Sequence, residues 1–299
     1  MRVFVTGATG WVGSTVTRDL RAAGHTVLGM ARSDAGAEAL RAEGVEVHRG
    51  ELTDIESLVA GAKACDGVIH TAFIHDFSKF AENIEIDRRA VEAMAAALEG
   101  TGKPFVISSG AAIIANGKLG VETDEPGPGA MRGASEDIVR EAAGRGVRSS
   151  AIRLSPTVHG AGDHGFVPQL IAIARAKGFA AYVGEGANCW SAAPVHDVAR
   201  LYALVLDKGV KGARYHAVAE EGVAARAIAE TVAAGLGVPA VSLATAAAEA
   251  YFGWFAMFAA LDLRASSTWT RAQLDWHPTG PGLIADLQAM NYAAPAVIA

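Results

Sequence analysis

Cysteine is scarce in this sequence, which contains only Cys65 and Cys189. They lie far apart and outside any CxxC or Cys/His cluster, so the sequence offers neither a disulfide framework nor the ligand spacing of a zinc site. The two could in principle pair, but a reduced protein is the simpler interpretation. We therefore expect no bound metal and a cytoplasmic location.

Long hydrophobic runs are missing as well. A membrane-spanning helix needs roughly 20 consecutive apolar residues, and no segment approaches that length. The segment 251–263 is apolar and aromatic, but it is short and contains Gly253 and Asp262. We therefore expect it to form core or a wall of the substrate pocket and not a membrane contact. The apolar residues 3–5 are too few for the hydrophobic part of a signal peptide. The sequence predicts no membrane partner.

Positive charge is in deficit, because 26 Lys and Arg residues stand against 32 Asp and Glu residues, a formal net charge of −6. A net negative field does not attract nucleic acid, so we expect no nucleic-acid partner. Hydrophobic residues make up 51% of the chain and charged residues 19%, unlike a disordered chain. The expected partner is a small-molecule substrate, and the chain could be a monomer or a homodimer.

The first half of the chain alternates short apolar runs with alanine-rich helical segments. The runs lack polar alternation, as strands buried on both faces do, and they predict strands at 2–5, 26–30, 45–48, 68–71, 105–108 and 149–153. Between them the sequence predicts helices at 11–23, 34–43, 54–62, 79–99 and 131–144. Repeated strand–helix units imply an α/β fold with a doubly wound parallel sheet of the Rossmann type.

The regularity of the pattern changes after residue 153. A Gly/Pro/His-rich loop, a helix and a short strand lead to residue 194, and the remainder is mainly helical. We expect a dinucleotide-binding domain at 1–155 that is completed by about 190–218. The rest of 156–299 is expected to form a smaller, mainly helical substrate-binding lobe.

The strongest signal is the glycine-rich turn between the first strand and the first helix. Glycines at Gly7, Gly10 and Gly13 fit a tight turn, a close approach of the backbone to a pyrophosphate and close helix–strand packing, in that order. The start of the helix offers free N–H groups to the phosphates. We expect the cofactor to contact this turn, including Thr9, Trp11 and Val12.

The spacing Thr-Gly-x-x-Gly-x-x-Gly near the N-terminus resembles the extended and atypical short-chain dehydrogenases/reductases, the NAD-dependent epimerase/dehydratase family. The resemblance covers nearly the whole chain. It implies an adenine contact at Glu51 and Leu52, with Glu in place of the usual Asp. It also implies that residues 71–73 (Thr71, Ala72 and Phe73) pass beneath the cofactor ribose. Pro156 and Val158 resemble the loop that meets the nicotinamide amide.

The end of the second strand decides which dinucleotide is bound. A carboxylate at this position accepts both ribose hydroxyl protons of NAD, but Arg32 and Ser33 stand here instead. A guanidinium matches a 2′-phosphate with two charge-assisted hydrogen bonds, so NADP is favoured over NAD. Asp34 follows slightly late and could cap the next helix. The alternative is that Arg32 is an ordinary solvated strand end.

The family's catalytic Tyr-x-x-x-Lys pair is absent. Its positions fall on Met131 and Ser135, and neither residue titrates near neutrality. The departure puts the family's proton relay in doubt but not cofactor binding. We assign Met131 and Ser135 to the substrate site, together with His164, Phe166 and Trp190, although large aromatic residues are often plain core.

Other polar residues must then supply the chemistry. Ser109 matches the family's hydroxyl after the fifth strand, although a shift of one residue would place Gly110 there. His75, at the rim of the sheet, and His159, in the loop after the sixth strand, titrate in the useful range. We predict Ser109, His159 and His75 as catalytic residues, although each could equally be structural.

The resemblance implies an NADPH-dependent oxidoreductase that reduces a small to medium, mainly apolar carbonyl compound. Two alternatives stay open. One is a non-catalytic NADP-binding sensor or regulatory protein, which the loss of Tyr and Lys would suit. The other is an epimerase or lyase that uses a bound cofactor transiently.

Overall fold

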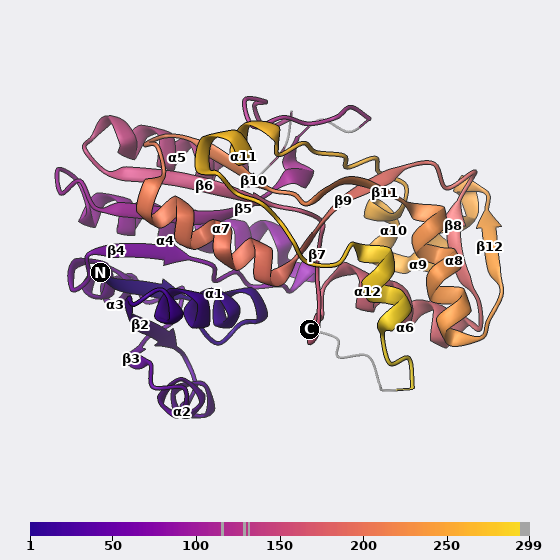
Figure 1. Cartoon of the computed structure of the whole chain (residues 1–299), viewed down its shortest axis with the longest axis horizontal. Helices are drawn as coiled ribbons and strands as arrows, with labels where there is room; N and C mark the ends of the chain where they lie inside the picture. The colour runs from indigo at the N-terminus through magenta and orange to yellow at the C-terminus, as the bar shows by residue number, and fades with distance from the viewer. Residues whose placement is uncertain (115–116, 128–129, 131, 294–299) are drawn as a thin grey trace.

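The computed structural model describes residues 1–299 except 115–116, 128–129, 131 and 294–299, and leaves out the side chain of Phe77. Its larger half is built on a seven-stranded sheet in the order β10-β6-β5-β4-β1-β2-β3, in which all recorded pairs are parallel (Figure 1). The strands are β1 (Arg2–Thr6), β2 (Thr26–Ala31), β3 (Glu46–Arg49), β4 (Gly67–His70), β5 (Pro104–Gly110), β6 (Arg148–Leu154) and β10 (Arg214–Ala217).

Helices cover both faces of this sheet, because the central strands are apolar on both sides. Val3 and Val5 of β1 pack with α1 and α7, whereas Phe4 between them packs with α3 and α4. The helices are α1 (Trp11–Ala22), α2 (Asp34–Ala42), α3 (Ile55–Lys63), α4 (Phe80–Ala97), α5 (Gly133–Gly144) and α7 (Val195–Lys208). The fold is therefore the doubly wound α/β fold that the sequence predicts.

The smaller half has its own hydrophobic core and lies beyond the carboxyl ends of the central strands (Figure 1). Its helices are α6 (Phe166–Lys177), α8 (Ala225–Leu236), α9 (Ala248–Phe252), α10 (Ala256–Ala259) and α12 (Leu283–Ala289). It also contains a three-stranded and a two-stranded sheet, in the orders β11-β9-β7 and β12-β8. Their strands are β7 (Thr157–His159), β8 (Ala180–Val183), β9 (Cys189–Pro194), β11 (Glu220–Ala224) and β12 (Ala240–Leu243).

The chain crosses between the two halves more than once. After β9 in the smaller half, α7 packs on α1 and β10 joins the edge of the large sheet beside β6. Near the C-terminus, α11 (Thr268–Leu274) contacts α7 and β10, and the buried Trp276 donates from Nε1 to the carbonyl oxygen of Asp197. Because α7, β10 and α11 all pack on the larger half, the smaller half is held at the carboxyl edge of the sheet, where doubly wound folds bind ligands.

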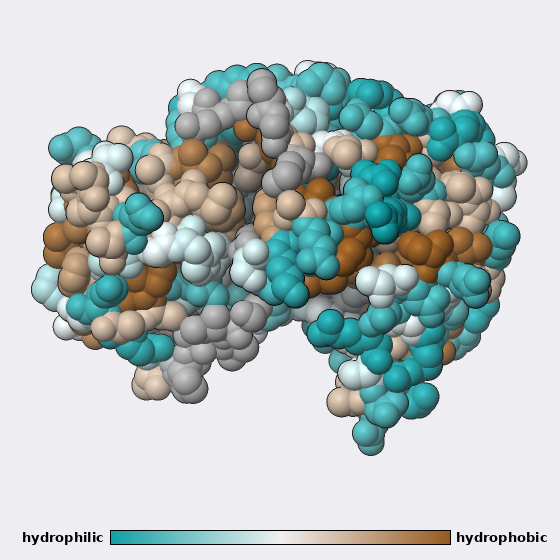
Figure 2. Space-filling model, turned by 180° about the vertical axis from the view of Figure 1, so that it is seen from behind, coloured by the Kyte–Doolittle hydropathy of each residue, from teal (hydrophilic) through white to brown (hydrophobic). Residues whose placement is uncertain are grey.

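Seen from the opposite side, a notch separates the two halves at the lower edge of the molecule, and hydrophobic surface gathers near their junction (Figure 2). Among the residues that the structure describes, no helix is both long and apolar enough to cross a membrane.

Candidate functional site

The glycine turn between β1 and α1 has the close packing that its sequence predicts. Gly7 has φ +69°, and a Cβ on it would lie 2.7 Å from the backbone nitrogen of Ala72. A Cβ on Gly13 would overlap the carbonyl oxygen of Gly7 and lie 2.6 Å from Thr71 Oγ1. Only glycine fits at either position, so the turn lies directly against the end of β4.

The first turn of α1 is open to an anion. Its N-cap is Gly10, which has no side chain to satisfy the free N–H groups, and the first turn contains no acidic residue. The amides of Trp11, Val12 and Gly13 are therefore available to phosphate oxygens, and the partial positive charge of the helix end favours them. Thr9, just before the cap, is exposed. The turn fits the pyrophosphate of a dinucleotide.

The end of β2 is rich in positive charge. Arg32 is exposed, and no carboxylate pairs with it among the residues that the structure describes. Arg49 at the end of β3 donates to the main-chain carbonyls of Arg32 and Ser33 and pairs with Asp34 at 3.1 Å. Asp34 is therefore engaged by Arg49 and not by Arg32.

Ser33 rather than Asp34 caps α2, which corrects the expectation from the sequence. Ser33 Oγ accepts a hydrogen bond from the amide of Gly36 at 3.1 Å, and Asp34 is the first residue of the helix. The proton of the Ser33 hydroxyl remains available to a phosphate oxygen.

The other expected cofactor contacts lie along the same edge of the sheet. Thr71 Oγ1 donates to the carbonyl oxygen of Thr6 at 2.8 Å, which fixes the start of the segment 71–73 beside the glycine turn. Glu51 is exposed and accepts from Thr53 Oγ1 at 2.8 Å, whereas Leu52 is buried. Thr71 therefore lies beside the glycine turn, while Glu51 is the exposed side chain of the pair expected at the adenine.

Trp11 joins the glycine turn to the loop that follows β7. Its indole Nε1 donates to the carbonyl oxygen of Ala161 at 2.9 Å, and its ring centre lies 6.2 Å from that of His164. The loop 160–165 is thus held over the start of α1. Pro156 and Val158, the residues expected at the nicotinamide amide, lie half-buried just before this loop.

Asp163 in this loop is an unusual carboxylate. It accepts from the amide of Gly165 at 2.7 Å and has no cationic partner among the described residues. Burial raises the pKa of Asp163 to about 7, and the single amide hydrogen bond opposes that shift only in part. The loop therefore carries a group that titrates near neutrality beside His164, and the sequence analysis did not identify it.

The helix in which the family has its lysine is used differently here. Ser135 is buried, and its Oγ donates to Asp87 Oδ2 of α4 at 2.8 Å. Asp87 Oδ1 lies 3.2 Å from His70 Nε2, and His70 Nδ1 lies 2.7 Å from Thr6 Oγ1. With the proton of His70 on Nε2, every contact in this buried chain is satisfied.

The charge state of Asp87 fits that chain. Burial alone would raise the pKa of its carboxyl, but the hydrogen bond and charge of His70, with Arg132 and Ser135, lower the pKa below its usual value. Asp87 is thus an ionised acceptor. Ser135 is committed to it, which leaves the predicted substrate contact of Ser135 without a free hydroxyl proton.

A second buried contact holds the same helix. Glu136 accepts from Arg153 of β6 in a two-pronged ion pair of 2.9 and 2.7 Å. The helix begins at Gly133 rather than at residue 131, and Met131 lies outside the described residues. Both polar side chains of the first turn therefore point into the protein and anchor α5 to α4 and β6.

The two serines at the end of β5 differ in their partners. Ser108 Oγ contacts the carbonyl oxygen of His70 and the hydroxyl of Tyr202 at 2.8 and 2.7 Å. Ser109 Oγ is buried and has no hydrogen-bond partner among the described residues. A Cβ on Gly110 would meet open space, so nothing there requires glycine. The unpartnered hydroxyl of Ser109 is available to a ligand.

The predicted histidines do not share one environment. The surroundings of His75 lower the pKa of its imidazole, through partial desolvation and then the charges of Arg132 and His164. The ring of His75 lies 5.2 Å from that of Phe73, whereas His164 lies beside Trp11. His159, by contrast, is buried, with Nδ1 2.6 Å from Asp286 Oδ2 of α12. Its Nε2 has no partner in the described part of the chain.

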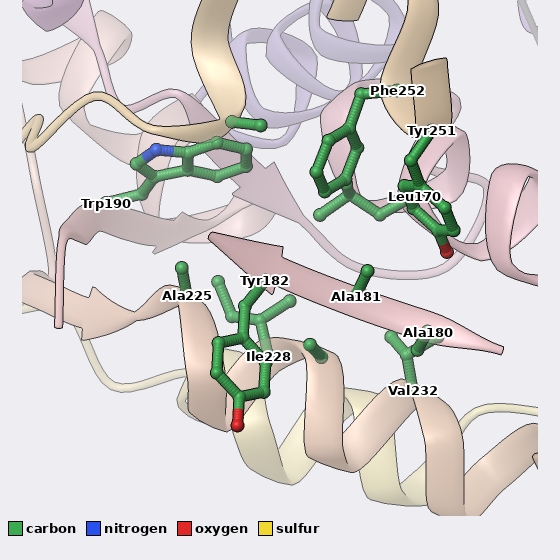
Figure 3. A pocket seen from close by; sticks show the side chains of 12 residues that line it. Leu170, Ala180, Ala181, Tyr182, Trp190, Ala225, Ile228, Val232, Tyr251 and Phe252 are labelled. Carbon is green, nitrogen blue, oxygen red and sulfur yellow. The ribbon is translucent and has the colours of Figure 1, made fainter. Parts of the chain in front are cut away.

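The aromatic residues proposed for the substrate form one cluster in the smaller half. The ring of Phe166 at the start of α6 lies 5.8, 5.0 and 4.9 Å from those of Trp190, Phe255 and Phe258. Trp190 is buried and also lines an apolar cavity between α6, β8, α8 and α9 (Figure 3).

This cavity is small. Only about 20 Å³ of it admits a water-sized sphere, whereas ligand pockets measure roughly 300–1,000 Å³. The cavity as it stands is therefore too small for a substrate. Among the described residues, no group of three or more His, Cys, Asp or Glu side chains is placed to hold a metal ion.

The fold and the site define a class: a dinucleotide-binding protein with a Rossmann sheet and a second, ligand-facing half. The sequence matches the NAD dependent epimerase/dehydratase family over residues 3–218. This chain therefore belongs to that family.

Comparisons with individual proteins agree. An uncharacterized protein of Schizosaccharomyces pombe is 45% identical over 98% of this chain and all of its own length. A ketoreductase of Stigmatella aurantiaca, named for 4-hydroxy-2-methyl-3-oxo-4-farnesyl-3,4-dihydroquinoline-1-oxide, is 30% identical over 72% of this chain and 67% of its own. The structure of UDP-glucose 4-epimerase from Thermus thermophilus with NAD has a TM-score of 0.76 at 21% identity, covering 98% and 99% of the two chains. This last similarity shows the fold alone.

The sequence analysis did not identify Arg132, which lies at the carboxyl end of β5. Its guanidinium lies over the ring of Phe73, 4.1 Å from the ring centre, and Nη2 donates to the carbonyl oxygen of Ser108 at 3.3 Å. The signal was available, since a cation follows directly on the position where the family's tyrosine is missing.

Proposed function

We propose that this protein uses NADPH to reduce the carbonyl group of a small to medium, mainly apolar compound. The observation that carries the proposal is the combination, at one edge of the sheet, of a glycine turn that fits a pyrophosphate and the buried, unpartnered hydroxyl of Ser109. Both cysteines are free in the structure, consistent with a reducing compartment such as the cytoplasm.

The preference for NADPH rests on the end of β2. Arg32 has no carboxylate partner in the described part of the chain, and the nearby Asp34 is paired with Arg49. A ribose 2′-OH gains little from this environment, whereas a 2′-phosphate can accept from the Arg32 guanidinium and from Ser33.

The choice of a carbonyl substrate has two supports. The Stigmatella relative is named a ketoreductase, and its named compound carries an apolar farnesyl chain. In this chain Phe166 and Phe258, the half-buried members of the aromatic cluster, offer an apolar surface. An apolar molecule with one reactive oxygen suits such a surface, because few of its atoms need hydrogen bonds.

When bound, NADPH supplies a hydride to the carbonyl carbon. The residues of this chain have three tasks: the glycine turn and Arg32 hold the cofactor, Ser109 donates to the substrate oxygen, and the aromatic cluster excludes water. A proton reaches the oxygen from water or from the loop, where His164 and Asp163 lie and where the Asp163 pKa is about 7.

The test is NADPH oxidation against a panel of ketones, aldehydes and activated alkenes. We expect turnover with apolar ketones or aldehydes, and a fall of about 10-fold for Ser109→Ala because one donor to the oxygen is lost. Ser108→Ala is the matched control, since Ser108 is bonded to His70 and Tyr202. Equal rates for wild type and Ser109→Ala would remove Ser109 from the reaction.

A non-catalytic NADP-binding sensor is the second candidate. The observation that favours it is the commitment of Ser135 to Asp87, which leaves no proton relay at the family's position. A sensor would bind NADPH tightly and oxidise it with no member of the panel. An epimerase or lyase would instead convert its substrate without net loss of NADPH.

A further inference from the structure

Arg132 is a half-buried cation without a carboxylate partner in the described part of the chain. Of its five N–H donors, one is recorded as used, in the 3.3 Å hydrogen bond from Nη2 to the carbonyl oxygen of Ser108. The flat side of the guanidinium lies over Phe73. A partly desolvated guanidinium normally finds an anion, so the remaining donors call for an acceptor.

The position of Arg132 in the fold also points to a ligand. Ser108 lies at the end of β5, and Phe73 belongs to the segment that follows β4. The carboxyl ends of neighbouring parallel strands form the ligand-binding edge of a doubly wound sheet. Arg132 therefore spans the two strand ends at the edge where the glycine turn also opens.

The charge of Arg132 reaches several groups at this edge. It contributes to the lowered pKa of His75, together with desolvation and the charge of His164. It also helps to lower the pKa of Asp87, although that carboxylate is hydrogen-bonded to His70 and Ser135. Asp87 is thus already hydrogen-bonded to other donors, and no carboxylate pairs with Arg132 in the described part of the chain.

Resting on the proposed function, we propose that Arg132 is a catalytic residue that binds the reacting carbonyl oxygen of the substrate and stabilises the negative charge that develops on it. It would take over the task that the absent Tyr and Lys perform together in the family. A guanidinium does not give up its proton at physiological pH, so Arg132 acts as an electrostatic donor and not as the acid.

The step balances as follows. Bound NADPH would give up a hydride, with its two electrons, to the carbonyl carbon and so become NADP⁺, while the π pair of the C=O bond moves onto oxygen. The free N–H groups of Arg132 hold this oxygen as its charge grows, and the oxygen then takes one proton from water to give the alcohol. Preorganised donors at a developing oxyanion are worth far more in a water-poor site than in solution.

The kinetic test uses Arg132→Gln and Arg132→Lys. Losing an oxyanion donor typically lowers kcat by about 100- to 1,000-fold, so we expect a fall of about 100-fold for Arg132→Gln with KM for NADPH unchanged. Arg132→Lys should recover only part of kcat, because an ammonium lacks the planar fork. Arg140→Gln is the matched control, since Arg140 is an exposed arginine of α5 paired with Asp137.

A structural role for Arg132, such as joining Phe73 to the end of β5, must be separable from catalysis. Arg132→Gly with added guanidinium chloride at millimolar concentration addresses this. We expect guanidinium to restore at least about 10-fold of kcat, and an equal concentration of ammonium or sodium chloride to restore none. A loss of kcat that guanidinium does not restore, accompanied by a lower thermal midpoint, would overturn the catalytic role.

A binding measurement keeps the proposal testable without turnover. Benzoate combines a carboxylate with an apolar ring, and we would titrate it into the protein saturated with NADP⁺. We expect Arg132→Gln to weaken benzoate binding by about 10-fold or more, with Arg140→Gln unchanged.

Carbonyl reduction that survives in Arg132→Gln would refute the catalytic role of Arg132 and leave the proposed function standing. Benzoate binding that depends on Arg132, with no reduction of any carbonyl, would refute the proposed function and leave Arg132 as an anion site. Equal benzoate affinities for wild type and Arg132→Gln would overturn the assignment.

Discussion

The glycine turn at residues 6–13 is shaped by backbone atoms, whereas α5 is held in place by side chains. The turn fits because added Cβ atoms on Gly7 and Gly13 would collide with their neighbours. In α5, Ser135 and Glu136 reach inward to Asp87 and Arg153. Cofactor binding by backbone geometry allows few substitutions, while catalytic side chains can be exchanged as long as the helix stays anchored.

This difference suggests how the family's chemistry has changed in this chain. The helix that carries the family's lysine keeps its place in the fold, but its first turn now stabilises the protein. In our proposal the positive charge of the site comes instead from Arg132, which precedes the helix and lies over Phe73. The predictions below test each side of this comparison.

The largest effect should come from filling the glycine turn. Gly13→Ala places a methyl group on the carbonyl oxygen of Gly7, and relief requires the turn to move. We expect the displaced turn to lower NADPH affinity by about 100-fold, or about 3 kcal/mol of binding free energy, because its amides no longer lie where the pyrophosphate binds. Titration calorimetry measures it. Gly144→Ala, where a Cβ meets open space, should bind NADPH as wild type does.

Removing the anchor of α5 should come next. Asp87→Ala leaves His70 and Ser135 without their shared acceptor, and we expect unfolding free energy to fall by about 3 kcal/mol. Ser135→Ala removes one hydrogen bond and should cost about 1 kcal/mol. Urea denaturation measures both. If neither variant lost stability, the buried chain would not be the anchor of α5.

The same carboxylate gives a pH dependence. Its pKa is lowered in the folded protein, so its contribution is fully present above the unfolded pKa of about 3.9 and is lost as the pH falls through the folded value. The stability difference between wild type and Asp87→Asn should therefore be constant from pH 8 to about pH 5 and shrink at lower pH. A difference that grew on acidification would contradict an ionised Asp87.

A smaller effect, on cofactor choice, should follow from Arg32→Ala. Losing a charge-assisted hydrogen-bonded pair costs about 1.5–3 kcal/mol, or roughly 10- to 100-fold in NADPH affinity. NADH affinity should hardly change, because NADH has no 2′-phosphate. Arg41→Ala, an exposed arginine of α2, controls for net charge. Equal losses for NADPH and NADH would exclude the assignment of Arg32.

The smallest effect concerns the contact between the glycine turn and the loop 160–165. Trp11→Phe keeps an aromatic ring but removes the donor to the carbonyl oxygen of Ala161. We expect a loss of about 1 kcal/mol in NADPH binding, as for one neutral hydrogen bond. An unchanged affinity would mean that the loop 160–165 stays in place without Trp11.

The large sheet could be predicted from sequence because its strands are continuous apolar runs separated by helical segments. The expected strands at 2–5 and 26–30 differ from β1 and β2 by one residue. The strands β7, β9, β11 and β12 were not anticipated, because they are short and contain alanine, histidine, glutamate and proline. Their pairing partners are distant in sequence.

The candidate site was less accessible to sequence reasoning. Glycine positions follow from backbone geometry, which a local motif records. The contact of Ser135 with Asp87 joins residues on two helices, and the contact of His159 with Asp286 joins the two ends of the second half. No local pattern contains such pairs. Arg132 could have been proposed from its position, but its lack of an ion pair is visible only in three dimensions.

The most direct test of the account is the fate of the hydride. NADPH deuterated at C4 would be incubated with the apolar ketones and aldehydes of the panel, and the products examined by mass spectrometry and NMR. We predict that one product alcohol carries deuterium on its carbinol carbon, with one NADPH oxidised per alcohol formed. Tight NADPH binding without oxidation by any compound of the panel would contradict a reductase and favour the sensor.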